Sequence, residues 1–439
     1  MSEPGTIICL RMYMHQPDGS KRPIGYLSIY GDIMRVSFDD DYIQNPARPT
    51  LSLAYRGADE NATRAILQSK TDERVTQQNG RWPAYFQNLL PESHNRDRLA
   101  LERNCTTEDE FELLAAAGHD LMGALEVEPT PAHEDIPVSV RHWHTAMGLD
   151  VLEPGFVEMP VPDAAAIPGV VTKFSAILDG LRYVVKRDGA AGSHIIKLPS
   201  SHHPDMAVNE FFGFKMCEAL GLDCAEASLV TPGEADLPEK VQDNFDFVLA
   251  VKRFDRENGR RVHMEEFAQA MNRLPKNKYG NYLISDYGLM LRLLDQYSSQ
   301  PVRDVQEFLN RFVVFVLMGN VDAHLKNWAL LYPDGVTPQL SPLYDPLCVT
   351  SYFDPKEPAK YGHNRWIDRM VSEFTWDGLR ELVRVAGLRR PEQLIRKVKE
   401  TVKEAQNLWP GFMSDDSFPD SMRVEITERL KGKVKLSQI

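Results

Sequence analysis

The apolar and polar positions of the first 128 residues alternate at first and later repeat with a helical period. Strand-like pieces lie at residues 6–12 and 26–29. Near the end of this zone, the run that begins at Phe111 predicts an amphipathic helix, which Gly118 is expected to close as a left-handed cap. We therefore expect a separate small domain over residues 1–128.

A proline-bearing stretch, residues 129–165, follows this domain. It shows no sustained apolar period, so we interpret it as a linker or an embellished loop. Its prolines stand at positions 129, 131, 137, 154, 160 and 162.

Residues 166–256 return to short alternating segments. The Asp179-Gly180 pair predicts a tight turn between the first two of them. This zone therefore predicts a small antiparallel sheet with one helix. The strands are expected at residues 174–178, 181–186, 194–198 and 247–251, and the helix from Pro204-Asp205 to its stop at Gly221.

The remaining zone, residues 257–439, is mainly helical. Its helical pattern is interrupted by strand-like segments at 328–332 and 339–343, with a Pro333-Asp334-Gly335 turn between them. We expect these two segments to form a hairpin.

Asp322 and Asn327, followed by Asp345, are the residues most informative about function. The spacing Asp-x-x-x-x-Asn with a later aspartate is how kinase-type phosphotransferases place one carboxylate near the attacking hydroxyl and two oxygen ligands on magnesium. Asp322 follows the apolar run 312–318 and leaves it through Gly319, so its carboxylate is held rigidly and still reaches solvent. The pattern predicts phosphoryl transfer from ATP with Asp322 as general base. A turn-capping role is the alternative for this aspartate alone.

Asn327 and Asp345 both carry hard oxygen donors of the kind that magnesium prefers. The predicted hairpin would fold Asp345 back beside Asn327. The alternative for Asp345-Pro346 is a simple turn start.

Two lysines are candidates for binding the phosphates of ATP. Lys197 ends an apolar strand, and Glu210 in the following helix is its expected partner; an edge lysine with its stem on the surface is the alternative. Lys173 closes the segment 168–173, which lies where a phosphate-covering loop belongs but carries a single glycine. It either neutralises phosphate or only decorates a strand.

The order of these elements is that of a two-lobed protein kinase. The predicted fold class is α+β: a small antiparallel sheet plus one helix, then a larger helical lobe, preceded by a small α+β amino-terminal domain. The expected boundaries are 1–128 for the amino-terminal domain, 129–165 for the linker, 166–256 for the small lobe and 257–439 for the large lobe.

The charge, the cysteines and the apolar runs of the chain limit which partners and which compartment we expect. With 63 acidic and 50 basic residues the net charge is −13, so this chain alone does not hold nucleic acid by bulk electrostatics, and a DNA contact would need a basic partner. The five cysteines form no Cys-x-x-Cys pair, which indicates core thiols in a reducing compartment. The sequence starts without a signal-like segment and has no apolar run long enough for a membrane span, so we expect a cytoplasmic protein without a membrane partner.

Two histidine groups invite a metal interpretation. His142-Trp143-His144 and His202-His203 have no cysteine or carboxylate at ligand spacing nearby, so solvated loop histidines are the better interpretation.

Nearly the whole chain resembles the HipA-like serine/threonine kinases, the toxin halves of bacterial toxin–antitoxin pairs. Residues 47–53, 86–92 and 118–124 are similar to the amino-terminal domain of that family. In the second half, similar segments are 168–173 (phosphate loop), 194–199 (ATP-lysine strand), 251–256 (hinge), 322–327 (catalytic segment) and Tyr344-Asp345 (metal segment).

The resemblance implies an ATP- and magnesium-dependent protein kinase with Asp322 as catalytic base and with Asn327 and Asp345 on the metal. It also implies a small helix-turn-helix antitoxin, which would supply the DNA contact indirectly, and a protein substrate such as an aminoacyl-tRNA synthetase, whose modification slows translation and growth. The cofactor-binding residues implied are Pro168, Gly169, Val170, Val171, Thr172, Lys173, Lys197, Glu210, Lys252, Arg253, Phe254, His324, Lys326, Asn327, Tyr344 and Asp345.

The chain departs from the family pattern at two loop positions. Family members commonly carry a serine three residues before the loop glycine, which autophosphorylates and switches the kinase off; Ala166 stands there. We therefore expect no self-inactivation at this position, while Thr172, Ser175 and Ser193 remain alternatives. Val171 replaces a usual glutamine.

Two other functions remain open at this point. The Asp-x-His-x-x-Asn form is also similar to phosphoinositide kinases, so a lipid or small-alcohol kinase is one alternative, although the acidic chain lacks the basic surface that such enzymes present to a membrane. The other is a non-catalytic, ATP-binding subunit of a repressor complex.

Overall fold

The computed structural model describes most of the chain, in two compact units. The first unit comprises residues 1–195, 255–278 and 331–337, and the second comprises 196–254, 279–330 and 338–439. The described residues are 6–130, 136–145, 153–169, 171–180, 182–185, 187, 189–200, 202–203, 205–237, 242–280, 283–354, 356–357 and 359–439.

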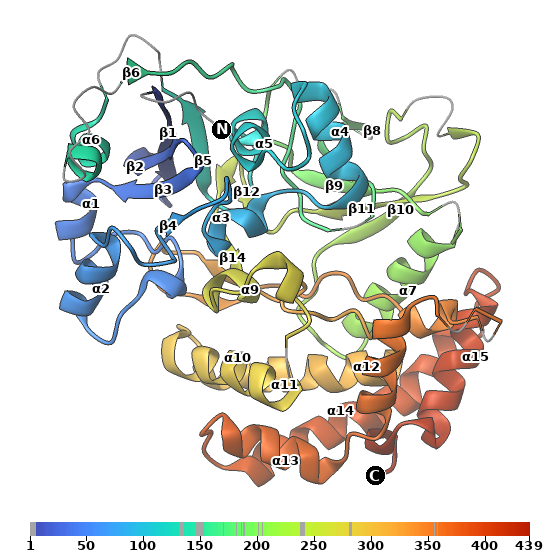
Figure 1. Cartoon of the computed structure of the whole chain (residues 1–439). Coiled ribbons are helices and arrows are strands. Elements are labelled where there is room, and N and C mark those ends of the chain that lie inside the picture. The colour runs from blue at the N-terminus through green and yellow to red at the C-terminus, as the bar shows by residue number, and fades with distance from the viewer. Residues whose placement is uncertain are drawn as a thin grey trace. The chain divides into compact units, whose positions relative to one another are not determined.

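A mostly antiparallel sheet organises the first unit. Its strands follow the order β4-β3-β2-β1-β5, and β6 pairs with β1 in parallel. In Figure 1 the blue strands β1, β2 and β3 run side by side. The strands are β1 (Thr6–His15), β2 (Lys21–Tyr30), β3 (Ile33–Phe38), β4 (Thr76–Gln77), β5 (Leu125–Pro129) and β6 (Glu153–Pro154).

Short helices complete the core of this sheet. The inner side chains of β1 and β2 are buried together with Phe86 and Phe111 of the helices and with Trp82, which lies just before α3. Burial of this apolar area is the main source of the unit's stability. The helices are α1 (Asp40–Gln44), η1 (Leu53–Tyr55), α2 (Glu60–Leu67), α3 (Ala84–Leu89), α4 (Ser93–Arg103), α5 (Glu110–Ala117) and α6 (Val138–Thr145).

Gly118 ends α5 for a reason other than the one predicted from the sequence. Its φ is −59°, in the right-handed region, so the expected left-handed cap is wrong. A Cβ at this position would lie 2.3 Å from the carbonyl oxygen of Val127, while Val127 N donates to Gly118 O at 2.9 Å. The glycine is needed because β5 packs directly on the helix end.

The stretch 129–165 is more than a linker. It contains α6 and β6, and Val140, Val157 and Ala164 are buried. Neither element shows a period in sequence because each is short and is stabilised by its neighbours.

The first unit also contains the beginning of the predicted small sheet. β7 (Lys173–Asp179) and β8 (Arg182–Val184) pair antiparallel, close to the predicted positions, and β9 (His194–Lys197) runs on into the second unit. Further elements of the first unit are β12 (Arg256–Glu257), β13 (Arg260–Arg261), β14 (His263–Glu266), α9 (Phe267–Ala270) and η2 (Pro275–Asn277).

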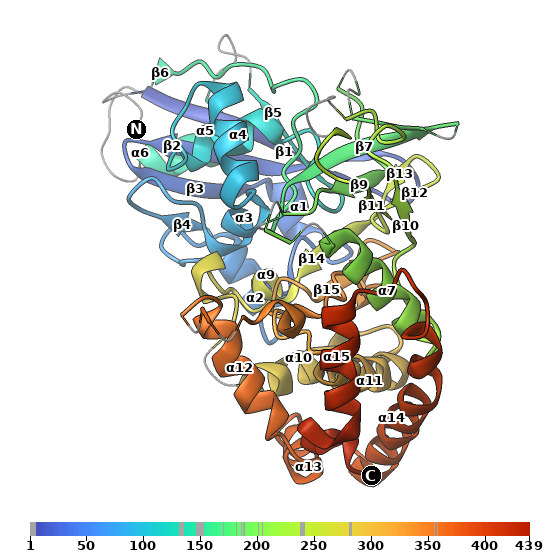
Figure 2. The same cartoon turned by 90° about the vertical axis from the view of Figure 1, so that its right-hand side faces the viewer.

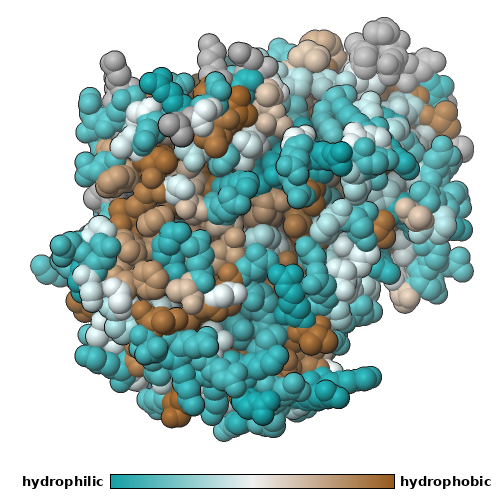
Figure 3. Space-filling view, turned by 180° about the vertical axis from the view of Figure 1, so that it is seen from behind, coloured by the Kyte–Doolittle hydropathy of each residue, from teal (hydrophilic) through white to brown (hydrophobic). Residues whose placement is uncertain are grey.

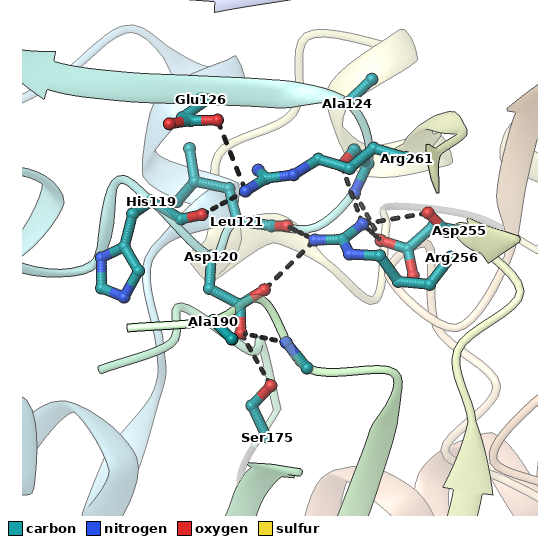
Figure 4. A network of polar contacts seen from close by, with 12 residues as sticks. His119, Asp120, Leu121, Ala124, Glu126, Ser175, Ala190, Asp255, Arg256 and Arg261 are labelled. Carbon is teal, nitrogen blue, oxygen red and sulfur yellow. Dashed lines mark hydrogen bonds and ion pairs between the residues drawn. The ribbon is translucent and has the colours of Figure 1, made fainter. Parts of the chain in front are cut away.

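Asp120 is the centre of a buried polar network in the first unit (Figure 4). Its carboxylate accepts hydrogen bonds from Ser175 Oγ at 2.7 Å, from Arg187 at 2.8 Å and from Arg256 at 3.1 Å. Arg256 also donates to Asp255 at 2.8 Å. We call these five residues the Asp120 network; they join the segment 118–124 to the strands that follow.

The second unit is mainly helical. Helix α11 is its central element and packs on α10 and α14, as Figure 2 shows from the side. Its elements are α7 (Met206–Glu218), β10 (Ala227–Val230), β11 (Val248–Lys252), α10 (Leu283–Tyr297), α11 (Pro301–Met318), β16 (Gln339–Leu340), η3 (Val349–Tyr352), α12 (Gly362–Ser372), α13 (Trp376–Val385), α14 (Pro391–Phe412), α15 (Asp420–Glu428), η4 (Arg429–Lys433) and η5 (Lys435–Ser437). Strand β15 (Ala329–Tyr332) begins in the second unit and ends in the first.

The predicted hairpin after residue 327 is present. β15 and β16 are neighbours in a sheet, Ser341 N donates to Ala329 O at 3.0 Å, and Gly335 N donates to Tyr332 O at 3.0 Å in the turn. Antiparallel strands followed by a helical region confirm the α+β class.

The surface and the cysteines agree with the composition. Polar residues cover much of the face in Figure 3, between separate apolar patches. Cys9, Cys217 and Cys348 are buried, whereas Cys105 and Cys224 are partly exposed. Within the described ranges, no helix combines the length and apolar character needed to cross a bilayer.

Candidate active site

Lys197 is the charged centre of a cluster in the second unit. It ends β9, is 7% exposed, and its Nζ lies 2.5 Å from Glu210 Oε1 and also contacts Asp345 Oδ1. Burial alone would lower the pKa of Lys197, but the charges of Asp345 and Glu210 and their hydrogen bonds raise it above its ordinary value. The ammonium therefore keeps its charge. We call these three residues the Lys197 cluster.

Helix α7 brings Glu210 to this cluster because it approaches the chain after Asp345 very closely. A Cβ at Gly213 would lie 1.7 Å from Pro346 O, so only glycine permits the contact. The side chain of Asn209 fixes the same segment: its Oδ1 accepts from Cys348 N at 2.9 Å, and its Nδ2 donates to Cys348 O at 3.3 Å.

Asp345 is tied to the loop 320–327 from both ends of that loop. Asn320 Nδ2 donates to Asp345 O at 3.0 Å, and the hydroxyl of Tyr344 donates to Lys326 O at 2.9 Å. Asp345 has a left-handed φ of +55°, and its side chain is 27% exposed. These two hydrogen bonds hold the loop and the segment after the hairpin together.

The loop itself is compact around Asp322. Helix α11 ends at Gly319, whose φ of +82° lets the chain turn sharply. The backbone oxygen of Asp322 accepts from His324 N at 2.7 Å and from Asn327 Nδ2 at 2.9 Å. Because its amide nitrogen points to this oxygen, the side-chain oxygen of Asn327 points to the other side of the amide and is suited to bind a cation.

The carboxylate of Asp322 has two side-chain donors that the sequence did not indicate. The hydroxyl of Tyr279 donates to Oδ1 at 2.6 Å, and Asn364 Nδ2 donates to the same oxygen at 3.0 Å. Both residues are far from Asp322 in sequence, so no local pattern could have identified them.

The hinge residues have different surroundings. The ring centroids of Phe254 and Tyr344 lie 5.7 Å apart. Tyr344 directly precedes Asp345, which belongs to the Lys197 cluster. Arg253 is buried, whereas Lys252 is exposed and its Nζ lies 2.7 Å from Glu226. Of these residues, Phe254 is the one whose contacts fit a nucleotide-binding aromatic.

The family described as HipA-like C-terminal domain matches residues 165–409, and the one described as HipA N-terminal domain matches residues 19–128. The chain belongs to the HipA-like family.

Individual relatives agree with this assignment. Y4dM of Sinorhizobium fredii, a protein whose name marks it provisionally as a kinase, is 33% identical over 379 residues, which is 85% of each chain. The serine/threonine-protein kinase toxin HipA of Shewanella oneidensis is 26% identical over 294 residues, 62% of this chain and 64% of that one. Among solved structures, the HipA, HipB and operator DNA complex of Shewanella oneidensis MR-1 matches with a TM-score of 0.63 at 20% identity, over 97% of this chain and 96% of that chain. This likeness confirms the predicted fold class.

The predicted phosphate loop of this HipA-like chain lies in the first unit. Lys173 Nζ donates to Pro168 O at 2.9 Å, so this lysine folds back on its own loop. Asn95 Nδ2 donates to Val171 O at 2.8 Å, and its Oδ1 accepts from Lys173 N at 3.0 Å. Thr172 belongs to the same loop, while Val170 lies outside the described residues.

The autophosphorylation sites considered from the sequence differ in exposure. Ala166, at the place of the usual serine, is fully buried. Ser175 is buried as well and donates to Asp120, so its hydroxyl is engaged in the Asp120 network. Ser193 Oγ lies 2.9 Å from His194 Nδ1.

The predicted loop histidines differ from one another. His202 is exposed, whereas His203 is half-buried, and its Nε2 lies 2.6 Å from the hydroxyl of Tyr361. His203 is thus not a merely solvated residue. The side chains of His142 and His144 lie outside the described part of the chain.

The donor set fits a magnesium–nucleotide pair. The Lys197 cluster combines one ammonium with two carboxylates, which leaves one negative charge in excess. One of these two carboxylates, that of Asp345, and the amide oxygen of Asn327 are the donors that could hold magnesium, which commonly takes one or two protein carboxylates with its remaining ligands from phosphates and water.

Proposed function

We propose that this HipA-like protein is an ATP- and magnesium-dependent serine/threonine protein kinase that acts as the toxin of a toxin–antitoxin pair. The observation that supports this most is the convergence of Lys197, Glu210 and Asp345 on one point, with Asp345 attached to the loop that carries Asp322 and Asn327. These groups are the parts that phosphoryl transfer requires.

Each residue has a proposed role in the reaction. Asp322 accepts the proton of the substrate hydroxyl through its carboxylate, a contribution of roughly 10²- to 10⁴-fold. Lys197, kept cationic by its two carboxylate partners, binds the phosphate oxygens of ATP, and Glu210 holds it in place. Asn327 and Asp345 hold magnesium, which when bound neutralises the charge on the transferring phosphoryl group.

The remaining predicted site residues have supporting roles in the proposal. Phe254 and Tyr344 offer aromatic surface to the adenine, together with the backbone of Lys252 and Arg253, while His324 and Lys326 shape the loop around Asn327. For the loop residues Pro168, Gly169, Val170, Val171, Thr172 and Lys173, a phosphate-binding role is proposed from the family resemblance alone.

The proposed partners are supported by a relative of known structure and by the charge of this chain, and not by its site geometry. A relative of known structure forms a complex with HipB and operator DNA. We propose a small helix-turn-helix antitoxin as partner here, because a chain with a net charge of −13 is poorly suited to contact DNA alone. The proposed substrate is a protein, with an aminoacyl-tRNA synthetase as one candidate.

Labelled ATP incubated with the protein, magnesium and a cell extract tests the function. We expect label on a discrete protein band with the wild-type chain and none with Asp322→Asn. Label in the lipid fraction would instead support a lipid kinase. Nucleotide binding with no label in any fraction would support a non-catalytic subunit and contradict the proposal.

A further inference from the structure

The carboxylate of Asp322 is held through one of its two oxygens. Tyr279 and Asn364 both donate to Oδ1, at 2.6 Å and 3.0 Å. Among the residues that the structure describes, no side chain or backbone group donates to Oδ2. Two donors on one oxygen fix the rotation of the carboxylate, so the second oxygen has a defined direction.

Tyr279 is itself held firmly. Its ring packs edge-on against His324, with centroids 5.2 Å apart, and against His363 at 4.4 Å. The next residue, Gly280, has a φ of +71°, and a Cβ there would lie 1.9 Å from Asp286 Oδ2. The chain therefore turns tightly against α10 directly after Tyr279, which directs the tyrosine toward the loop 320–327.

Asn364 is placed by an unusual helix start. Tyr361 precedes α12 with a left-handed φ of +59°, a conformation that costs energy for a residue with a large side chain. Its hydroxyl lies 2.6 Å from His203 Nε2, which anchors it. From the first turn of α12, Asn364 Nδ2 reaches both Asp322 Oδ1 and Val321 O, the latter at 3.2 Å.

We infer that Tyr279 and Asn364 are positioning residues that hold Oδ1 of Asp322 so that Oδ2 faces the hydroxyl of the substrate. This inference rests on the proposed kinase function, in which Asp322 accepts a proton. Neither residue touches the reacting atoms in this role. They act because a base that is free to rotate is aligned with the substrate hydroxyl for only part of the time.

Removing each donor singly tests the inference. Tyr279→Phe and Asn364→Ala should each lower kcat about tenfold, the size expected for one hydrogen bond to a charged group, while KM for ATP changes less than about twofold. The measurement uses labelled ATP, magnesium and the extract protein that wild type labels and Asp322→Asn does not. An unchanged kcat, or a change confined to KM, would overturn the inference.

Tyr42→Phe is the matched control, since it also removes one hydroxyl from a buried tyrosine. The hydroxyl of Tyr42 donates to Pro49 O at 2.8 Å in the first unit. We expect wild-type kcat and KM from this variant. A tenfold loss there as well would show that general loss of a buried hydroxyl lowers activity, and would overturn the inference.

Asn364→Asp separates donation from shape. Aspartate has nearly the shape of asparagine but directs a negative acceptor at Asp322 Oδ1 and Val321 O. If Asn364 acts as a donor, Asn364→Asp lowers kcat more than Asn364→Ala does. If it only fills space, aspartate is the milder change, and that order would overturn the inference.

A crystal structure of the Tyr279→Phe, Asn364→Ala double variant gives a readout that does not need activity. We expect the carboxylate of Asp322 to rotate away from its wild-type orientation. An unmoved Asp322 would overturn the inference even if the wild-type protein transferred no phosphate. Absence of transfer by the wild type, by contrast, would count against the proposed function alone.

Discussion

The Asp120 network and the Lys197 cluster are both buried groups of charge, but they differ in balance. The Asp120 network pairs two carboxylates with two guanidinium groups. The Lys197 cluster pairs two carboxylates with one ammonium. The first is neutral, and the second has one negative charge in excess.

The two groups also differ in their exposure to solvent. Asp120 is fully buried and accepts from Ser175, Arg187, Arg256 and a backbone amide. The side chain of Asp345 is 27% exposed. A buried network of balanced charges stabilises a fold, whereas a partly exposed carboxylate beside a lysine is placed to bind a cation, and the lysine a phosphate.

The largest effect should come from Asp345→Ala. We expect it to lower magnesium-dependent phosphoryl transfer at least about a thousandfold, or ~4 kcal/mol in activation free energy, because the proposed metal ligand and one of the two carboxylate partners of Lys197 are lost together. The thermal midpoint should stay near that of wild type. The measurement is labelled-ATP transfer at saturating magnesium.

Asp295→Ala is the control for that change. Asp295 is an exposed aspartate of the same unit, on α10, and its removal should leave transfer within about twofold of wild type, as is usual for surface substitutions. Substantial activity in Asp345→Ala would show that Asp345 is not a metal ligand. The Lys197 cluster would then not differ from the Asp120 network in function.

The next largest effect should come from Asp120→Asn, which breaks the other group. The side chain keeps its shape, but Arg187 and Arg256 stay buried without their shared carboxylate. We expect the free energy of unfolding to fall by about 3 kcal/mol, measured by urea denaturation, since removing one partner strands a buried charge. Nucleotide binding by the folded variant should be retained.

Asp377→Asn provides the contrast on the surface. Asp377 pairs with Arg380 at 2.7 Å, but both side chains are solvent-exposed. We expect no measurable change in the urea midpoint, because solvent screens such pairs. Equal effects of the two substitutions would show that burial does not distinguish the Asp120 network from an ordinary ion pair.

Whether a part of the candidate site could be predicted from the sequence depends on how far apart its residues lie along the chain. Asp322, Asn327 and Asp345 form a recognisable pattern because one short loop and one hairpin bring them together. Lys197 and Glu210 follow from the strand-then-helix order. Each of these predictions required only local geometry.

The groups that hold the site in place could not be read in the same way. Tyr279, which follows η2, and Asn364 of α12 reach Asp322 from separate parts of the chain, and Asn209 reaches a segment more than a hundred residues away. Gly118 fitted a local capping rule, but a close approach by β5 decides its conformation. In each case a tertiary contact is decisive, and one sequence contains no record of it.

Glu265 is a third kind of buried carboxylate, because it has no cationic partner among the residues that the structure describes. It is fully buried in the first unit and accepts from Leu53 N at 2.9 Å and from the hydroxyl of Tyr332. Burial, opposed by these hydrogen bonds, raises the pKa of Glu265 from 4.5 to about 7. A carboxyl with a raised pKa favours the folded state at low pH, and that contribution is lost as pH rises from about 4.5 through about 7.

Glu265→Gln should therefore change the pH dependence of stability. The raised pKa of Glu265 makes the free energy of unfolding of wild type on the order of 2 kcal/mol lower at pH 8 than at pH 5. The variant should lack this part of the decrease. Urea denaturation at the two pH values measures it. Glu404→Gln, at an exposed position on α14, should keep the wild-type decline, and an unchanged decline in Glu265→Gln would show that Glu265 ionises normally.

A further, smaller effect should come from Gly213→Ala, which tests how the Lys197 cluster is assembled. The new methyl would meet Pro346 O, so α7 must move away from the segment after Asp345 and take Glu210 with it. We expect a loss of about 1 to 2 kcal/mol in unfolding free energy from overpacking, and a fall in transfer rate of about tenfold or more as the pairing of Lys197 loosens. Gly411→Ala is the control, because nothing lies within 4 Å of a Cβ there, and alanine in α14 should stabilise slightly. If both variants behave alike, the close approach of α7 does not set the geometry of the Lys197 cluster. If only Gly213→Ala loses activity, the geometry of the Lys197 cluster depends on one close glycine contact, whereas the Asp120 network is held by its own ion pairs.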